Sequence, residues 1–479
     1  MNAFKLRSIV GGRFMRESKR NREAIELAKL KILQAAKKPA CYLGIVMVVL
    51  TIVYIVDEIT SSMNSAMQPY ILFDLFNITS RDVNSELYKH AINVIAPLSM
   101  LSTFLLIITP FYKALADRFG RRIFLMINTM GMGIGMLVVM TSTTVVQYII
   151  GVFVMSFFTP NDMQVLYIME VAPKEKRATY SFIAKGIALM SASLIGVFSK
   201  LFLREELMQS WKNVYFIPVV LALVIGFACI FFVRETPVFL DQRIAYLSLT
   251  EEERKQKKEE EKRNNTSENG GVINALKFIF SNKQLRWILI AGFIFFATTV
   301  YTSYYATVLE GAMSTASVAT AIMIFPFFNG FMTIISGFIS DRLGRKKVCI
   351  LLGSITLIAL LVFIVACREA WGPVAAGIAY GISIGGLWSM SDTIILTMPA
   401  ESTPSGMRAS VMGTISVLIG SGMFVGQALF ILLQNIISMD MVFLLISVPF
   451  MVISLLIIMG KVKETKDVDL ENITADTYK

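Results

Sequence analysis

The sequence contains little of the chemistry on which enzymes and metal proteins depend. Only 16% of its 479 residues are charged, one is a histidine (His90) and four are cysteines. Cys41, Cys229, Cys349 and Cys367 are widely separated and lack metal-ligand spacing, and no nucleophile stands beside a base. The chain also lacks a glycine-rich phosphate loop that ends in Lys-Ser or Lys-Thr. We therefore expect no enzyme activity, no metal, no cofactor and no direct use of ATP.

Apolar residues, in contrast, are in large excess. Hydrophobic residues make up 55% of the chain and the mean hydropathy is +0.65, far above the values of soluble proteins of this length. A hydrocarbon core about 30 Å thick requires about 20 apolar residues of helix. The sequence contains twelve runs of this kind. Because a helix satisfies its own backbone polar groups in lipid, we predict an all-α integral membrane protein with twelve transmembrane helices.

The predicted helices form two sets of six, separated by a long polar stretch. The first set comprises residues 41–67, 90–112, 123–141, 145–169, 179–203 and 213–233. The second set comprises residues 286–308, 317–339, 348–366, 371–399, 409–434 and 438–459. The predicted regions are a basic N-terminal segment (1–38), a first six-helix bundle (39–233), a central loop (234–285), a second six-helix bundle (286–460) and a tail (461–479). Within the central loop, residues 250–263 fit a solvated helix and 264–271 a flexible hinge.

The positive charge of the chain follows this predicted topology. The net charge is +11, and most of the 45 Lys and Arg residues lie in the segments 1–38, 234–285 and 461–479 and in short loops on the same side. Because Lys- and Arg-rich segments stay in the cytoplasm, we expect both termini to be cytoplasmic. Membrane orientation thus accounts for the basic composition, and no nucleic-acid partner is expected. Residues 23–33 also fit an amphipathic helix on anionic lipid, as an alternative to a plain basic flank.

Two short motifs occur once in each half of the chain. Asp117–Arg122 and Asp341–Lys347 each join the second and third helix of their set. The pattern E-x-x-P-x-x-x-R follows the fourth helix of each set, as Glu170–Arg177 and Glu401–Arg408. Paired motifs at matching places indicate that one ancestral unit has been used twice.

These motifs resemble those of the major facilitator superfamily, and most closely those of its sugar-porter branch. The family loop pattern G-x-x-x-D-R-x-G-R-[RK] is complete in Gly337–Lys346 and lacks only its first glycine in Lys113–Arg122. Arg234–Leu240 is similar to the branch motif P-E-S-P-R-W-L, and Val462–Lys466 is similar to its terminal P-E-T-K. The resemblance implies two pseudo-symmetric six-helix bundles that open a central site to one side of the membrane and then to the other.

The repeated charges suggest a network that holds the cytoplasmic gate shut. In this interpretation Asp117 and Asp341 pair with arginines, Glu170 pairs with Arg177 and Glu401 pairs with Arg408. An exposed ion pair contributes only about 0–1 kcal/mol, so only a connected network would bias the equilibrium between two states. The alternative is that the charges merely set the membrane orientation, and the repeated acidic residues favour gating. The predicted gating residues are Asp117, Arg118, Arg121, Arg122, Glu170, Arg177, Asp341, Arg342, Arg345, Lys346, Glu401 and Arg408.

Polar residues deep within the apolar runs predict the substrate and proton pathway, because ionisable groups in a membrane are costly and by default functional. The candidates are Asp57, Glu58, Asn161, Asp162, Lys185, Tyr304, Tyr305, Asp392 and Gln427. Each has a structural alternative, namely pairing with a neighbouring helix, interhelical hydrogen bonding or aromatic packing.

Asp57 and Glu58 lie near the middle of the first predicted helix. Tyr54–Asp57 resembles the F-G-Y-D of proton-coupled sugar porters, in which the aspartate takes up the coupling proton, so the resemblance implies a proton as coupling ion. The arginine that the family places early in the fourth helix is absent around Tyr148–Ile150. Neighbours on a helix point about 100° apart, so the sequence leaves open which of Asp57 and Glu58 faces a cavity.

Lys185 stands where the resemblance places a sugar-coordinating glutamine of the family. A lysine facing the cavity would suit an anionic substrate, such as a carboxylate, or would pair with Asp57 or Asp162. Alternatively its side chain reaches water at the nearby helix end. Asn161 and Asp162 in the fourth helix lie at the same depth as Ser391–Thr393 in the tenth, where a site shared by both halves belongs.

The aromatic and amide candidates lie in the second half. Tyr304 and Tyr305 resemble the Y-Y of the family's seventh helix, although the glutamines that precede it are missing, and Gln427 lies in the eleventh helix.

We expect a secondary active transporter of the plasma membrane, most simply a monomeric proton symporter for a small polar solute such as a sugar. The alternatives are a symporter of organic anions such as carboxylates and a drug-export antiporter. A protein of a different class, a membrane sensor that no longer transports, is also compatible with the scaffold. Retention of both gating motifs favours transport, since a static receptor has no need to alternate.

Overall fold

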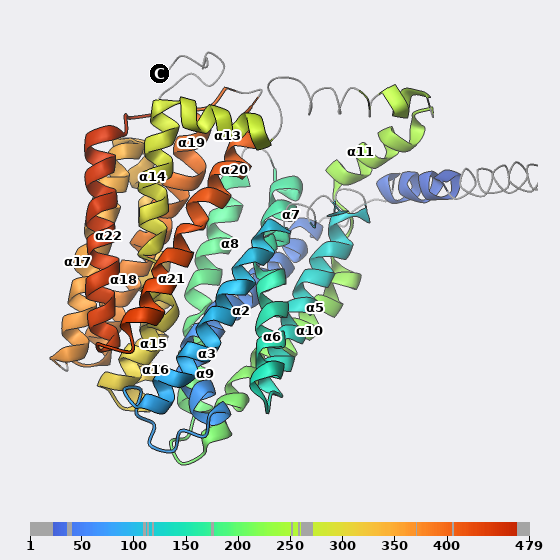
Figure 1. Ribbon diagram of the computed structural model, residues 1–479. Coiled ribbons are helices and arrows are strands. Elements are labelled where there is room, and N and C mark those ends of the chain that lie inside the picture. Colours follow the sequence, from blue (N-terminus) through green and yellow to red (C-terminus); the bar gives the residue numbers. More distant parts are fainter. Residues whose placement is uncertain are drawn as a thin grey trace, which may run out of the picture.

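The structure is a computed structural model that describes residues 23–35, 41–108, 112, 115–116, 119–173, 177–250, 252–256, 259, 272–369, 371–404 and 407–466. Every regular element within these ranges is a helix. Figure 1 shows most helices running along a common direction in two groups, one blue to green from the N-terminal half and one yellow to red from the C-terminal half. The all-α two-bundle fold predicted from the sequence is therefore confirmed.

Many helices of both bundles are interrupted by short irregular turns. The elements of the first bundle are α2 (Tyr42–Leu75), α3 (Glu86–Thr103), η1 (Phe104–Ile107), α5 (Arg121–Met140), α6 (Val145–Phe158), η2 (Thr159–Asn161), α7 (Met163–Val171), α8 (Arg177–Ser191), α9 (Ser193–Phe202), η4 (Met208–Ser210) and α10 (Trp211–Phe232). The elements of the second bundle are α14 (Lys283–Ala297), α15 (Val300–Ala312), α16 (Thr315–Leu343), α17 (Arg345–Arg368), α18 (Pro373–Asp392), η5 (Thr393–Thr397), α19 (Met398–Glu401), α20 (Arg408–Gly420), α21 (Gly422–Leu433) and α22 (Met439–Lys461).

Among the described residues, 11 helical segments are long and apolar enough to cross a membrane. They correspond to 11 of the twelve predicted spans. The remaining one, predicted at residues 90–112, corresponds to α3 and η1 and is described without a break as far as residue 108. The first helix is longer than predicted and continues to Leu75 instead of residue 67. Its extra turns are buried, including Gln68 and Tyr70, because they pack against protein and not lipid.

The central loop contains two helices that the sequence analysis missed, α11 (Pro237–Ser248) and α13 (Val272–Ser281). The hydroxyl of Thr236 caps α11 by accepting a hydrogen bond from the Phe239 backbone N–H, and Pro237 occupies the first helical position. The charged pattern at 250–263 is helical at 252–256. The predicted hinge at 264–271 lies outside the described residues.

Residues 23–35 are helical, as the amphipathic pattern predicted, and they dock on α11. Leu30 packs with Phe239 and Leu240, while Glu26 forms an ion pair with Arg243 at 2.9 Å. A second ion pair joins Glu23 and Arg254 at 2.8 Å. The acidic residues of this helix thus contact the central loop, and its contact with lipid stays a prediction.

The two ends of the bundle differ in how the halves meet. We call the end that carries the turns at Gly120 and Gly344 the loop-motif end, which is uppermost in Figure 1 with α11 and α13. At the opposite end, hydrogen bonds join the halves. They run from Tyr70 Oη to Glu310 Oε2 (2.5 Å), between Tyr88 Oη and Thr307 Oγ1 (2.9 Å) and from Gln434 Nε2 to Asn93 Oδ1 (2.7 Å). These contacts close the molecule at the opposite end.

Close helix packing reinforces this closure. α9 of the first bundle lies against α16 of the second, and a Cβ atom on Gly196 would stand 2.3 Å from the Met323 backbone nitrogen. Glycine is therefore required at this crossing, because the two backbones leave no space for a side chain.

Candidate functional site

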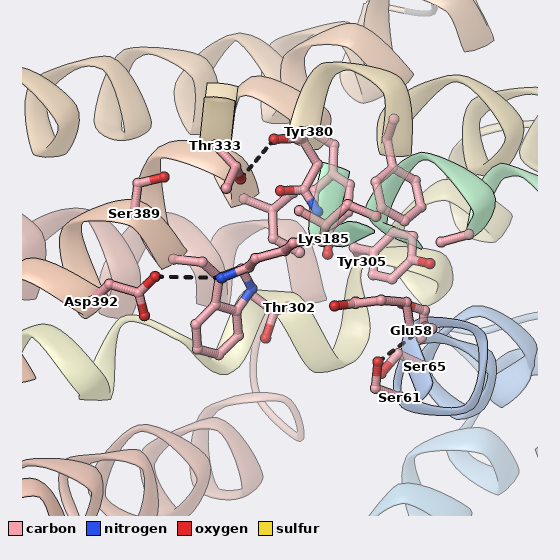
Figure 2. Close-up of a pocket in the computed structure, with 17 residues that line it drawn as sticks. Glu58, Ser61, Ser65, Lys185, Thr302, Tyr305, Thr333, Tyr380, Ser389 and Asp392 are labelled. Atoms are coloured by element: carbon pink, nitrogen blue, oxygen red, sulfur yellow. Dashed lines mark hydrogen bonds and ion pairs between the residues drawn. The ribbon is translucent and has the colours of Figure 1, made fainter. Parts of the chain in front are cut away.

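A central cavity of about 320 Å³ lies between the halves. Helices α2 and α8 line it from the first bundle, and α15, α16 and α18 line it from the second. Its polar wall is labelled in Figure 2. Among the lining residues are Glu58, Ser61, Ser65, Lys185, Thr302, Tyr305, Asn329, Thr333, Tyr380, Trp388, Ser389 and Asp392.

Lys185 and Asp392 connect the two halves across this cavity. The Lys185 Nζ atom lies 3.7 Å from Asp392 Oδ2, with 35% and 57% of the two side chains exposed (Figure 2). The expectation that Lys185 pairs with Asp57 or Asp162 is wrong. The lysine instead meets the carboxylate that the tenth span contributes. The alternative of a side chain that reaches water stays a prediction, since 35% of the side chain is exposed.

Glu58 faces the cavity and Asp57 does not. Glu58 belongs to the cavity lining, and its carboxylate has no hydrogen-bond or ion-pair partner within the described part of the chain. Asp57 is 8% exposed and accepts a hydrogen bond from Gln164 Nε2 of α7 at 2.9 Å. The rotation of α2 therefore settles the question that the sequence left open, and it places the acidic pair between α7 and the cavity.

Apart from Asp392, the second bundle supplies uncharged polar side chains to the cavity wall. In the described part of the chain, the buried atoms Tyr305 Oη, Tyr380 Oη, Asn329 Oδ1 and Ser389 Oγ have no hydrogen-bond partner. An unsatisfied buried polar group costs about 1–3 kcal/mol, so these atoms are a local cost to the stability of the wall. Sequence analysis missed Asn329, Tyr380 and Ser389, although a polar residue in the middle of an apolar helix was the available signal.

Spans four and ten both lose regular α-helical geometry beside an aspartate. In span four, the 3₁₀ turn η2 is followed by Asp162, which has a left-handed backbone with φ of 47°. In span ten, the π-helical turn η5 begins directly after Asp392. Such irregular turns recur at functional sites. Only Asp392 lines the cavity, whereas Asn161 donates from Nδ2 to the Phe157 carbonyl at 2.8 Å within its own span.

Tyr304 and Gln427 pack together away from the cavity wall. The hydroxyl of Tyr304 donates to Gln427 Oε1 at 3.2 Å, and its ring stacks on Phe430 with centroids 3.9 Å apart. Of the nine predicted pathway residues, the structure brings Glu58, Lys185, Tyr305 and Asp392 to the cavity. A pathway role for the others stays a prediction.

At the loop-motif end, each half contains its own ion-pair network. In the first half, Arg121 donates from Nε and Nη2 to Glu170 Oε1 at 3.1 and 3.0 Å. The Thr236 hydroxyl donates to the other oxygen of Glu170 at 2.6 Å. Glu235 accepts the Arg121 backbone N–H at 2.9 Å. The segment 234–240, which resembles the sugar-porter motif, thereby stabilises the turn before α5.

The second half repeats this arrangement. Arg345 donates from Nε to Glu401 Oε1 at 3.1 Å, and the Thr465 hydroxyl donates to Glu401 Oε2 at 2.6 Å. Glu464 accepts the Arg345 backbone N–H at 2.7 Å. The expected pairing of Glu401 with Arg408 is wrong, since Arg408 Nη2 donates to the Thr403 carbonyl. The chain fold brings Arg345 nearer to the carboxylate than its sequence neighbour.

The other predicted gating residues hold the ends of neighbouring helices. Arg122 donates from Nη2 to the Ile230 carbonyl. Lys346 Nζ donates to the Met459 carbonyl at 2.8 Å, and the Arg342 carbonyl accepts from Lys466 Nζ at 3.0 Å. Asp117 and Arg118 lie outside the described residues, as do the side chains of Arg177 and Asp341. Gating by these residues stays a prediction.

Glu235 and Glu464, which contact the turns at Gly120 and Gly344, differ in the direction of their pKa shifts. Burial raises the pKa of Glu235, although hydrogen bonds from the backbone N–H groups of Thr236, Arg121 and Arg122 oppose the shift. Partial burial also acts on Glu464, but four backbone N–H groups, first that of Lys466, outweigh it and hold the pKa below its usual value.

Gly120 is expected to be irreplaceable at the turn before α5. Its φ is 112°, and an added Cβ would stand 2.4 Å from Glu235 Oε2. Gly120→Ala should therefore lower the free energy of unfolding by about 1–3 kcal/mol, measured by equilibrium unfolding in detergent. Gly413→Ala in α20 is the control, because a Cβ there meets nothing within 4 Å. Equal stability of the Gly120 variant and the parent would contradict this role.

The fold and the cavity define a helical membrane protein in which two related bundles enclose a polar site, the architecture of a secondary transporter. The model of the Major Facilitator Superfamily matches residues 50–427 and 311–472 of this chain. The chain belongs to the Major Facilitator Superfamily.

Similar proteins include transporters of sugars and nucleosides. The glucose transporter GlcP of Staphylococcus epidermidis is 23% identical over 384 residues, which cover 75% of this chain and 83% of GlcP. The xylose transporter XylE from E. coli, in an inward-open conformation, is 16% identical with a TM-score of 0.65, over 90% of this chain and 99% of XylE. The nucleoside transporter NupG is 14% identical with a TM-score of 0.61, over 87% of this chain and 100% of NupG.

Proposed function

We propose that this protein is a secondary active transporter of the plasma membrane that moves a small polar solute, a sugar or a related hydroxylated compound, by alternating access. The central cavity between the bundles carries this proposal. Its lining combines hydroxyl and amide side chains with ionisable ones, which suits a solute rich in hydroxyl groups. The names of GlcP and XylE, which refer to glucose and xylose, support the same class of substrate.

The structure fits the state of the cycle that is open at the loop-motif end. A second cavity of about 580 Å³ shares Lys185, Ser389 and Asp392 with the central cavity and reaches Arg345 at the loop-motif end. The opposite end is closed by hydrogen bonds between the halves, such as Tyr70 to Glu310. The basic segments beside the loop-motif end support a cytoplasmic location for it. In that orientation the solute site faces the cytoplasm.

Transport is coupled to protons through the acidic pair of α2. Glu58 is reached from the cavity, while Asp57 stands behind it on Gln164. A carboxylate that exchanges its proton with the cavity in one state and is occluded in the other links the proton gradient to solute movement. This arrangement supports symport of proton and solute.

We expect Glu58→Gln to abolish proton-driven accumulation. In proteoliposomes with a gradient of one pH unit, one-to-one symport supports about tenfold accumulation, because one pH unit corresponds to about 1.4 kcal/mol. The glutamine mimics a permanently protonated Glu58, so the accumulation ratio should fall to about one while solute exchange without a gradient persists. The measurement uses labelled hexoses, pentoses and sugar acids, with Glu86→Gln as control since the Glu86 side chain is 92% exposed.

Two outcomes would overturn this proposal. If neither sugars nor sugar acids exchange across the membrane through the parent protein, the substrate class is wrong. If Glu58→Gln accumulates solute as the parent does, the proton does not bind at Glu58. Exclusive transport of simple carboxylates would favour the second candidate, an organic-anion symporter, for which the ammonium group of Lys185 in the cavity is the supporting observation.

A further inference from the structure

The two cavities of the structure share a small set of lining residues. The central cavity extends from there toward Glu58 and Ser65, and the wider cavity, which we call the vestibule, extends toward Arg345 and Thr397. Lys185, Thr333, Ser389 and Asp392 line both. Any solute that moves between the central cavity and the loop-motif end therefore passes these four residues.

The ion pair lies at this junction and joins the two bundles. Lys185 extends from α8 of the first half, and Asp392 from α18 of the second half, and their charged groups are 3.7 Å apart (Figure 2). Because each partner belongs to a different half, the pair stands across the passage and not along one of its walls.

The four residues that line both cavities are called the neck. We propose that the Lys185–Asp392 ion pair, called the crossbar because it joins the two bundles, closes this neck and selects solutes by charge. It is a specificity-determining element of the transport cycle proposed above. A solute with hydrogen-bond donors and acceptors but no net charge passes by bonding to both partners in turn. A simple cation is repelled by Lys185 and a simple anion by Asp392.

The strength of the pair suits a barrier that opens often. Both side chains retain considerable exposure, 35% and 57%, and pairs of this kind are weak because solvent screens them. A crossbar that held for long would block transport. One that breaks frequently still presents both charges to each solute that enters the neck.

The other charged groups near the neck do not replace the pair. Glu58 lies on the central-cavity side and its carboxylate also interacts with the charge of Lys185, so removing Lys185 leaves two carboxylates facing the passage without a cation. Arg345 lies on the vestibule side and is bound to Glu401, so removing Asp392 leaves Lys185 as the cation at the neck. The two single substitutions should therefore shift selectivity in opposite directions.

The test measures access to a cysteine beyond the neck and needs no substrate. Ser65→Cys, which lies in the central cavity only, is introduced together with Cys41→Ser, because Cys41 is exposed while the three other cysteines are buried. The purified protein in detergent is treated with a cationic or an anionic methanethiosulfonate of matched size. We expect Lys185→Gln to accelerate the cationic reagent, and Asp392→Asn the anionic one, each by about two- to fivefold.

The charge exchange, Lys185→Asp with Asp392→Lys, should return both rates to those of the parent, because it restores an ion pair across the neck. Thr397→Cys in the vestibule is the matched control, and its rates should change less with either substitution than those of Ser65→Cys, because a reagent reaches it without passing the neck. If both reagents respond equally to both single variants, or if the charge exchange behaves as the single variants do, the crossbar does not exist. These outcomes are independent of solute uptake, so failure of the crossbar and failure of the proposed transport function are distinguishable.

Discussion

Glu170→Ala is expected to lower the free energy of unfolding by about 3–5 kcal/mol, because it removes the carboxylate that binds the buried guanidinium group of Arg121. Only 8% of the Arg121 side chain and 10% of the Glu170 side chain are exposed. Glu170 accepts two hydrogen bonds from Arg121 and a third from Thr236. Removing one partner of a buried ion pair takes away the charge that best compensates the other. Equilibrium unfolding in detergent micelles measures the loss.

Three further variants separate the causes of this loss. Thr236→Ala removes a single hydrogen bond and should cost about 1 kcal/mol. Glu401→Ala, the same change in the second half, should cost less than Glu170→Ala because its pair is more exposed, at 20% and 15%. Arg121→Met combined with Glu170→Leu should recover much of the stability, because apolar replacement of both ions leaves no charge unpaired. A Glu170→Ala protein as stable as the Thr236→Ala protein would show that Arg121 is compensated in another way.

Gly196→Leu is expected to force the opposite end of the molecule apart. A Cβ at this position would stand 2.3 Å from the Met323 nitrogen and 2.6 Å from the Ala319 carbonyl oxygen. Both are backbone atoms of α16, so no side-chain rotation relieves the clash. Helix axes separate by about 2 Å when bulkier residues enter a contact. The hydrogen bonds that close this end, such as Tyr70 to Glu310, should weaken as the halves part.

Spin labels at the exposed positions Leu207 and Ile436 measure this change, since these residues lie at the opposite end on different halves. We expect the distance between the labels to increase in Gly196→Leu. Gly413→Leu is the control, because a Cβ at Gly413 meets nothing within 4 Å. An unchanged distance in the Gly196 variant, with the protein folded, would mean that the α9–α16 crossing does not hold the halves together.

Some site residues were predictable because their position along a helix decides their environment. Lys185 and Asp392 are charged residues within long apolar runs. Charged side chains in transmembrane helices face the interior of the bundle or a water-filled cavity, so a cavity was the expected location. The structure brings both to the same cavity. The duplication likewise placed Asp162 and Asp392 at matching depths, and both spans are irregular there.

Partners across the fold were not predictable in the same way. Glu401 lies close in sequence to Arg408, yet it binds Arg345, which comes from the turn between two other helices. Tyr380, Asn329 and Ser389 look like ordinary polar residues in the sequence. Only the arrangement of α16 and α18 around the cavity shows that their polar atoms lack partners within the described part of the chain.

The sequence by itself determined the membrane class, the helical spans and the two-fold repeat of this Major Facilitator Superfamily protein, because apolar run length and repeated motifs are properties of the chain alone. The tertiary structure decided which face of each helix meets the cavity and which charges pair. A rotation of about 100° separates Asp57 from Glu58 on α2, and only packing sets that rotation. It turns Glu58 toward the central cavity and leaves Asp57 on Gln164, since each helix orients to bury its best-fitting face against its neighbours.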